Sequence, residues 1–97
     1  MIELYQAEWC PHSHRVRERL TELGLDFVAR QVSPDPQQRP QMQQATGGHS
    51  IPTLVDNGRV FAGDEDILAH LDSAYEEPPA AEAHRAKDAE EGPVWRG

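Results

Sequence analysis

The sequence predicts a small α/β domain in which one four-stranded mixed sheet is flanked by helices. Three observations predict this class. A β-prone segment at residues 2–7 precedes an amphipathic helical pattern at 11–23, and a second β-rich segment follows at 25–32. An Asn-Gly turn joins two strand-like segments within 52–63, and a last helical pattern covers 64–75. With a short helix between the second and third strands, the order of elements is β-α-β-α-β-β-α.

The first half of the domain is a predicted strand–helix–strand unit. Pro11 suits the first helical position, where its missing N–H costs nothing. Gly24 follows the last apolar position and suits the end of the helix. We expect the strands at 2–7 and 25–32 to pair in parallel, joined through the helix by a right-handed crossover. The apolar stripe of this helix consists of Val16, Leu20 and Leu23.

The second half begins with an expected loop at 33–40, which holds three prolines. Residues 41–48 predict a short helix that ends at its two glycines. The hairpin turns at Asn57-Gly58, a strong two-residue turn sequence. Asp64 is the expected N-cap of the last helix. The apolar positions of that helix are Ile67, Leu68 and Leu71.

Composition and charge limit the classes of function. The chain of 97 residues carries a formal net charge of −8, divided as −5 over residues 1–74 and −3 over 75–97. This acidic balance leaves no basic patch, so we expect neither nucleic acid nor an anionic membrane surface as a partner. The lack of a signal-peptide pattern or membrane-spanning stretch predicts a cytoplasmic protein. We expect a monomer.

The predicted domain covers residues 1–75. Residues 76–97 are rich in Pro, Ala and Glu and have little apolar surface to bury, so we expect an acidic, mobile C-terminal tail. The chain has a single cysteine, Cys10, which excludes an internal disulfide and a multi-thiolate metal site within one chain. We therefore expect no metal site. The lone thiol then serves either as a reactive group or as a packed core side chain.

Cys10 lies between the first predicted strand and the first predicted helix, directly before Pro11. At such a position the free backbone N–H groups and the positive end of the helix dipole favour a thiolate, which is the nucleophilic form. The alternative is a small core residue, because free cysteines are often buried. The position at the helix start favours the reactive thiol.

Three segments together resemble a known superfamily. "CPHS" follows a strand and opens a helix, "SIPTLV" leads into the third strand, and "GDED" begins the last helix. In this order they resemble the thioredoxin-fold superfamily, and more narrowly the glutaredoxins and the N-terminal domain of the glutathione transferases. The resemblance covers roughly residues 2–74. It implies a thioredoxin-like fold, and we expect this glutathione-binding fold to stand alone, without the transferases' helical second domain.

By this resemblance, Cys10 is the nucleophile of a monothiol thiol–disulfide oxidoreductase. Its substrates would be mixed disulfides of glutathione or a similar small thiol, glutathionylated proteins among them. Ser13 takes the place of the second cysteine of dithiol relatives, and its hydroxyl would either hydrogen-bond the thiolate or serve as an ordinary first-turn residue. His12, if protonated, would stabilise the thiolate, or it would face solvent. No tightly bound cofactor is implied, and glutathione is a co-substrate.

The resemblance also implies a set of glutathione-binding residues. Pro52 corresponds to a cis proline beside the thiol, and the backbone of Ile51 would pair with the bound peptide as an added strand. A trans proline that only starts the strand is the alternative. The start of the last helix would receive the γ-glutamyl group, unless Asp64 only caps that helix. Arg15 and Arg39 are alternatives for the glycine carboxylate. The implied binding residues are Trp9, Pro11, Ile51, Pro52, Asp64 and Glu65.

Two departures from the family pattern keep other functions open. Glutaredoxins often carry a lysine three residues before the cysteine, where this chain has Ala7 followed by Glu8. A carboxylate there would raise the pKa of the thiol, which favours a non-catalytic glutathione-binding module as the alternative. Pro11 stands where cluster-binding relatives have glycine, so an iron–sulfur carrier is a third, less favoured hypothesis.

Overall fold

The computed structural model describes residues 1–78, and the predicted tail from residue 79 onward lies outside them. The predicted order of strands and helices is confirmed. The elements are β1 (Ile2–Gln6), α1 (Pro11–Glu22), β2 (Val28–Gln31), a short 3₁₀ helix (Pro36–Gln38), α2 (Pro40–Thr46), β3 (Thr53–Asp56), β4 (Arg59–Ala62) and α3 (Asp64–Ala74).

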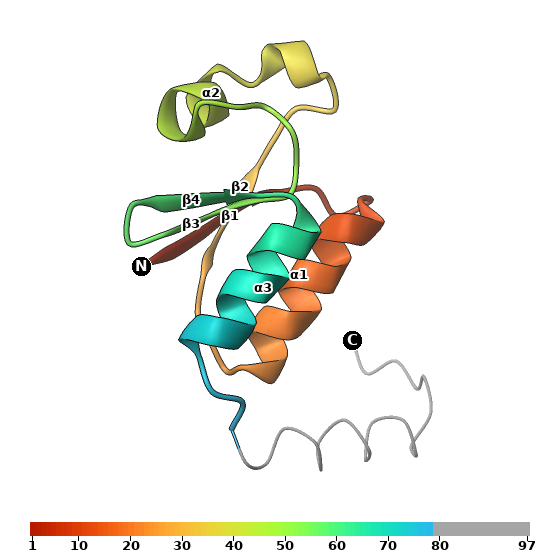
Figure 1. Ribbon diagram of the computed structural model, residues 1–97. Helices are drawn as coiled ribbons and strands as arrows, with labels where there is room; N and C mark the ends of the chain where they lie inside the picture. Colours follow the sequence, from red (N-terminus) through yellow and green to blue (C-terminus); the bar gives the residue numbers. More distant parts are fainter. Residues whose placement is uncertain (79–97) are drawn as a thin grey trace.

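The four strands form one mixed sheet in the order β2-β1-β3-β4 (Figure 1). Strand β1 pairs in parallel with β2 and antiparallel with β3, while β3 and β4 form the predicted hairpin. Asn57 and Gly58 both have positive φ at its turn, 51° and 86°, as a two-residue hairpin of this twist requires. Because β1 and β2 are parallel, their C-terminal ends lie at the same end of the sheet. Cys10 follows β1 at this end.

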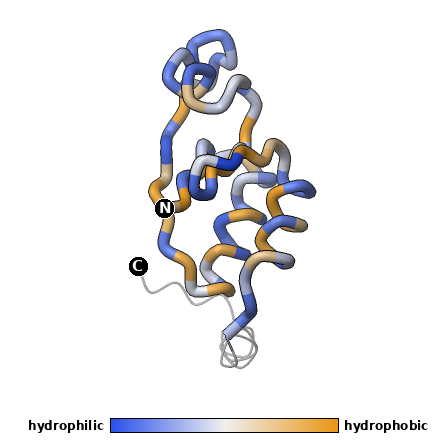
Figure 2. Tube along the Cα trace, turned by 60° about the vertical axis from the view of Figure 1, so that its left-hand side comes forward, coloured by the Kyte–Doolittle hydropathy of each residue, from blue (hydrophilic) through white to orange (hydrophobic). Residues whose placement is uncertain are grey.

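Helices α1 and α3 lie side by side on one face of the sheet (Figure 1). Their apolar residues alternate with hydrophilic ones along each helix, so that each has one apolar stripe (Figure 2). Burial of that stripe is the main stabilising contribution, at about 25 cal/mol per Å² of apolar surface. The fully buried members of the core are Leu4, Val16, Leu20, Leu54, Ile67 and Leu71.

Helix α2 and the 3₁₀ helix lie on the other side of the sheet from α1 and α3 (Figure 1). The short helix expected within 41–48 is confirmed, although it begins one residue earlier, at Pro40. Gly47 ends it with a φ of 81°, a conformation that glycine adopts without strain. The segment expected to be a loop contains one ordered turn, because the Asp35 side chain accepts a hydrogen bond from the backbone N–H of Gln37.

Strand β2 is shorter than the predicted segment at 25–32. Leu25 closes the end of α1 instead, since its N–H donates to the carbonyl of Leu20 while the N–H of Gly24 donates to that of Thr21. These two bonds form a Schellman motif, with Gly24 at a φ of 68°. Leu25 and Phe27 are apolar because they pack against the core, and not because they belong to the strand.

The prediction that Asp64 is the N-cap of α3 is wrong. Gly63 is the N-cap, with a φ of 90°, and its carbonyl accepts the N–H of Ile67. Asp64 is the first helical residue, and its side chain bonds to two residues of α1. At this position its charge still favours the helix through the dipole.

The described chain continues past the predicted boundary at residue 75. Glu77 accepts a hydrogen bond from Arg19 at 3.0 Å, so this part remains attached to α1. None of the helices within residues 1–78 combines the length and the hydropathy needed to span a bilayer.

Candidate active site

The turn between β1 and α1 holds Cys10 at the N-cap position of the helix. The backbone N–H of Cys10 donates to the carbonyl of Ala7 at 3.1 Å, and its own carbonyl accepts the N–H of His14. Its Sγ accepts the backbone N–H of Ser13 at 3.5 Å, so the sulfur occupies the place of a capping oxygen. The residue is 7% exposed, so the thiol is mostly buried.

Ser13 lies directly beneath the thiol and is fully buried. Its hydroxyl oxygen lies 3.5 Å from the backbone N–H of Ala7, which donates to it, and the hydroxyl donates in turn to the sulfur of Cys10. The hydroxyl of Ser13 therefore lies next to the thiol, and its role toward a thiolate stays a prediction.

Several contacts act on the pKa of the Cys10 thiol. Burial raises it and is the largest single influence. The opposing contributions are the Ser13 hydroxyl, the backbone N–H groups of Ser13 and His12, and the charge of Arg17. Together they outweigh burial, so the pKa of Cys10 lies below its ordinary value. A lowered pKa increases the thiolate fraction at neutral pH.

Arg17 is a residue of this site that the sequence analysis missed. Its Nη1 lies 3.3 Å from the carbonyl of Ala7 and 3.5 Å from Oε2 of Glu8. Arg17 thus places a positive charge beside residues 6–8, from a position two turns after Cys10 on α1. The spacing of seven residues is the pattern that would have pointed to it.

His12, Arg15 and Asp64 meet between the N-terminal ends of α1 and α3. Nδ1 of His12 lies 3.0 Å from Oδ2 of Asp64, and Nη1 of Arg15 lies 2.7 Å from the same oxygen. The hydrogen bond from His12, above all, lowers the pKa of Asp64, and the charges of His12 and Arg15 add to it. His12 thus reaches the thiol only through its backbone N–H, while its imidazole bonds to Asp64.

The loop before β3 completes the same end of the domain. The Ile51–Pro52 peptide bond is cis. The carbonyl of Pro52 accepts the N–H of Gly63 at 2.9 Å, which ties this loop to the start of α3. Arg39 is buried and donates to the carbonyls of Ser33 and His49, so two of its nitrogens fasten the two loops together.

These contacts connect Cys10 through His12 to Asp64, and Gly63, which precedes Asp64, to Pro52. Three other predicted residues, Trp9, Pro11 and Glu65, lie on the outside of this end. Trp9 is 64% exposed, so most of its indole faces solvent rather than covering the thiol. Pro11 and Glu65 are exposed as well.

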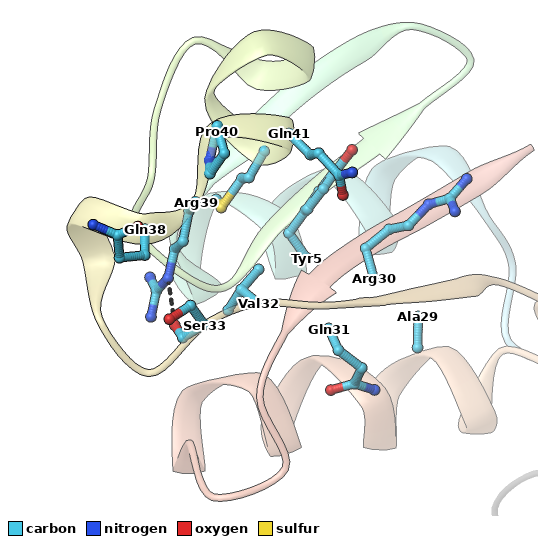
Figure 3. A pocket seen from close by; sticks show the side chains of 11 residues that line it. Tyr5, Ala29, Arg30, Gln31, Val32, Ser33, Gln38, Arg39, Pro40 and Gln41 are labelled. Carbon is cyan, nitrogen blue, oxygen red and sulfur yellow. Dashed lines mark hydrogen bonds between the residues drawn. The ribbon is translucent and has the colours of Figure 1, made fainter.

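A pocket of about 560 Å³ lies elsewhere, between β2 and α2 (Figure 3). Tyr5 and Met42 contribute apolar surface to it, and the side chains of Arg30 and Gln41 contribute polar groups. Of the residues predicted for the thiol site, one lines it: Arg39, an alternative for the glycine carboxylate. Within residues 1–78, no three His, Cys, Asp or Glu side chains are grouped so that they could hold a metal ion.

The sequence and the fold have counterparts among known proteins. The family described as "Glutathione S-transferase, N-terminal domain" matches residues 4–79. This chain belongs to that family. Glutaredoxin 3 of Escherichia coli (strain K12) is 25% identical to it over 68 residues, which cover 70% of this chain and 82% of the relative. A glutaredoxin-like 8.6 kDa protein of Clostridium pasteurianum is 27% identical over 63 residues, 65% of this chain and 84% of the relative.

Solved structures of other proteins share the fold. The thioredoxin-like protein BC3987 superposes with a TM-score of 0.61 at 29% identity, over 73% of this chain and 99% of its own. A delta-class glutathione transferase of Nilaparvata lugens superposes with a TM-score of 0.70 at 25% identity, over 90% of this chain and 44% of the transferase. The predicted thioredoxin-like fold is confirmed, and the chain spans less than half of the transferase.

Proposed function

We propose that this domain is a monothiol thiol–disulfide oxidoreductase that acts on mixed disulfides of glutathione or a closely similar small thiol. The observation that carries the proposal is the environment of Cys10. Its sulfur caps α1, accepts two hydrogen bonds from Ser13 and has a pKa below the ordinary value. Its similarity to proteins named glutaredoxin and glutathione S-transferase supports the choice of thiol.

The reaction would proceed by two exchanges. In the first, the Cys10 thiolate attacks the glutathione sulfur of a mixed disulfide. A disulfide forms between Cys10 and glutathione, and the other thiol leaves as a thiolate that takes a proton from water. In the second, the thiolate of another glutathione attacks the glutathione sulfur bound to Cys10. Oxidised glutathione forms and the Cys10 thiolate is regenerated.

The groups around Cys10 offer partners for each part of the tripeptide. The backbone of Ile51, next to the cis proline, would pair with the main chain of glutathione. The γ-glutamyl carboxylate would bind at the start of α3, and its ammonium would bind the Asp64 carboxylate. Both α1 contacts of Asp64 end on Oδ2, so the ammonium would bind through Oδ1. Arg15 is the more accessible of the two candidate arginines, since Arg39 is buried.

The test is turnover of the mixed disulfide of glutathione and 2-mercaptoethanol, with oxidised glutathione as the measured product. The wild type should turn over, and Cys10→Ser should show only the uncatalysed rate. Ser13→Ala should retain the nucleophile and lose rate at pH 7, because the thiolate loses a hydrogen bond. Wild-type rates equal to those of Cys10→Ser would contradict the proposal.

The buried position of Cys10 favours one second candidate, a non-catalytic glutathione-binding module. Calorimetry with reduced glutathione separates the two. A module of this kind would bind glutathione in both the wild type and Cys10→Ser and would turn over nothing. An enzyme would bind and turn over.

A further inference from the structure

Arg17 extends from the second turn of α1 back toward the turn that holds the thiol. Its Nη1 donates to Oε1 of Gln6 and to the carbonyl of Ala7, and it also pairs with Glu8. The Arg17 side chain is only 19% exposed. A long cationic side chain held by three consecutive residues of another segment loses much of its rotamer freedom, so its charge is fixed in position.

Ala7 connects this contact to the thiol. Its carbonyl accepts from Arg17 and also from the backbone N–H of Cys10, while its own N–H donates to Ser13 Oγ. The peptide groups of one residue therefore hold both the backbone of the nucleophile and the hydroxyl beneath it. A guanidinium on that carbonyl orients and polarises the same group.

The partners of Arg17 differ in how far they cancel its charge. Gln6 is fully buried and neutral, and its Oε1 is turned to Arg17 even though its Nε2 is buried without a partner among the described residues. The reverse orientation would place the amide N–H groups against the guanidinium. The acidic partner, Glu8, is 72% exposed, so solvent screens its charge. The guanidinium is thus held mainly by neutral groups.

The other basic side chains near this end are paired with carboxylates. On α1, His12 and Arg15 both bond to Asp64, the first residue of α3, while Glu65 and Asp66 of the same helix add negative charge. Further along α1, Arg19 is shared among Glu22, Asp72 and Glu77. The charge of Arg17 lowers the pKa of the Cys10 thiol, in addition to the larger contributions of the hydrogen bonds from Ser13 and His12.

We propose that Arg17 is a positioning residue that keeps Cys10 ionised and correctly placed, and that Glu8 moderates this effect by partly neutralising the guanidinium. The inference rests on the proposed thiol chemistry and adds to it the residue pair that sets the reactivity of the nucleophile. Arg17 takes over the electrostatic role of a lysine before the cysteine, and it does so from the opposite side of the turn.

The test is the pKa of Cys10, measured from the pH dependence of its alkylation by iodoacetamide, in the full chain. Arg17→Met should raise this pKa by up to about half a unit and slow alkylation at pH 7 up to about threefold. Arg17→Lys should recover part of the shift, because it keeps a charge without the planar fork. Glu8→Gln should lower the pKa by a few tenths of a unit, about the size expected of a screened surface charge.

Arg30→Gln is the matched control. Arg30 is half exposed, pairs with Glu3 and also carries one positive charge, but it lies on β2. This variant should leave the pKa of Cys10 unchanged. Circular dichroism shows whether Arg17→Met is folded, and if it is not, Arg17→Lys and Glu8→Gln decide alone. A pKa that none of these three folded variants moves would overturn the inference.

The two proposals fail in different ways. If the wild-type pKa lies near the free-thiol value of about 8.5 and turnover is absent, the proposed function fails. The shifts between variants would still show whether Arg17 acts on the thiol. If the wild-type pKa is low and turnover is present while the variants leave both unchanged, the function stands and the role of Arg17 fails.

Discussion

Two Asp–His pairs of nearly equal length lie at opposite ends of the sheet. At the end where Cys10 lies, His12 is 3.0 Å from Asp64, and at the other end His70 is 2.9 Å from Asp56. Their surroundings differ sharply. The side chain of His12 is 63% exposed, whereas those of His70 and Asp56 are 11% and 7% exposed. The same chemical pair therefore serves different purposes in the two places.

The inner pair, His70–Asp56, is part of a buried network of hydrogen bonds and ring contacts. Oδ2 of Asp56 also accepts the hydroxyl of Tyr75 at 2.7 Å, and the His70 ring stacks on Phe61 with 3.9 Å between the ring centroids. This network ties the β3–β4 hairpin to the end of α3. A buried carboxylate with two hydrogen-bond partners is costly to disturb, because each lost partner leaves a buried polar group unpaired.

The outer pair, His12–Asp64, can be rearranged at little cost in stability. The side chains of His12 and Arg15 are 63% and 55% exposed, so water replaces these partners of Asp64 readily and the contacts contribute little to stability. A ligand that approaches the start of α3 could therefore compete for Asp64 without unfolding the domain. The comparison shows that burial, rather than the identity of the pair, separates a structural contact from one suited to a binding site.

The largest expected effect comes from removing the inner carboxylate. Asp56→Ala should lower the free energy of unfolding by about 3 kcal/mol, because His70 and Tyr75 lose a shared buried partner. Urea denaturation followed by circular dichroism measures this. Asp64→Ala is the matched variant at the outer pair, and its loss should be much smaller. Equal losses in the two variants would contradict the comparison.

The same contrast should appear as a dependence of stability on acid. Burial alone raises the pKa of Asp56, but the hydrogen bonds from His70 and Tyr75 outweigh it and leave this pKa below its usual value. The stabilisation is therefore present above the unfolded pKa, about 3.9, and is lost as pH falls through the lower folded value. Urea midpoints between pH 6 and 3 should fall more steeply in the wild type than in Asp56→Ala. Parallel curves would argue against this origin.

A smaller effect is expected from Tyr75→Phe, which removes one hydrogen bond to Asp56 and keeps the ring. It should cost about 1 kcal/mol at neutral pH. The bond to Asp56 raises the pKa of Tyr75, so its contribution is complete below the unfolded pKa of about 10 and is lost as pH rises through the folded value. The wild type should thus lose more stability at high pH than Tyr75→Phe, as measured by urea midpoints between pH 8 and 11.

The smallest effect is expected on the thiol when the outer histidine is changed. His12→Gln keeps the backbone N–H that acts on Cys10 and removes the imidazole that bonds to Asp64. Alkylation of Cys10 at pH 7 should therefore stay within about two-fold of the wild-type rate. Binding of glutathione, measured by calorimetry, is the property that should change. A much slower alkylation would show that the imidazole itself stabilises the thiolate.

Local sequence patterns predicted the features that depend on residues close together in the sequence. The Asn57-Gly58 turn, the start of α1 at Pro11 and the place of Cys10 before it each depend on neighbours within a few residues. The hydrophobic stripes predicted which faces of α1 and α3 are buried, although Leu68 of the predicted α3 stripe is only half-buried and lies outside the core cluster. The resemblance added the cis bond before Pro52, which no local pattern fixes.

Contacts between distant residues were beyond such patterns. The bonds of His12 and Arg15 to Asp64 span about fifty residues and exist only because α1 and α3 lie side by side. The same holds for His70, whose partner Asp56 lies on another element. The role of Arg17 depends on a side chain that folds back over the turn before its own helix. In each case helix packing decides the partner.

The serine beside Cys10 has a consequence for how long a disulfide formed on Cys10 persists. Ser13 occupies the buried place from which a second cysteine would act, and the chain holds no other thiol. Any disulfide formed on Cys10 must then be opened by a thiol that arrives from another molecule. The lifetime of such an adduct is set by the concentration of free thiol around the protein, so the state of Cys10 would follow the thiol supply of its surroundings.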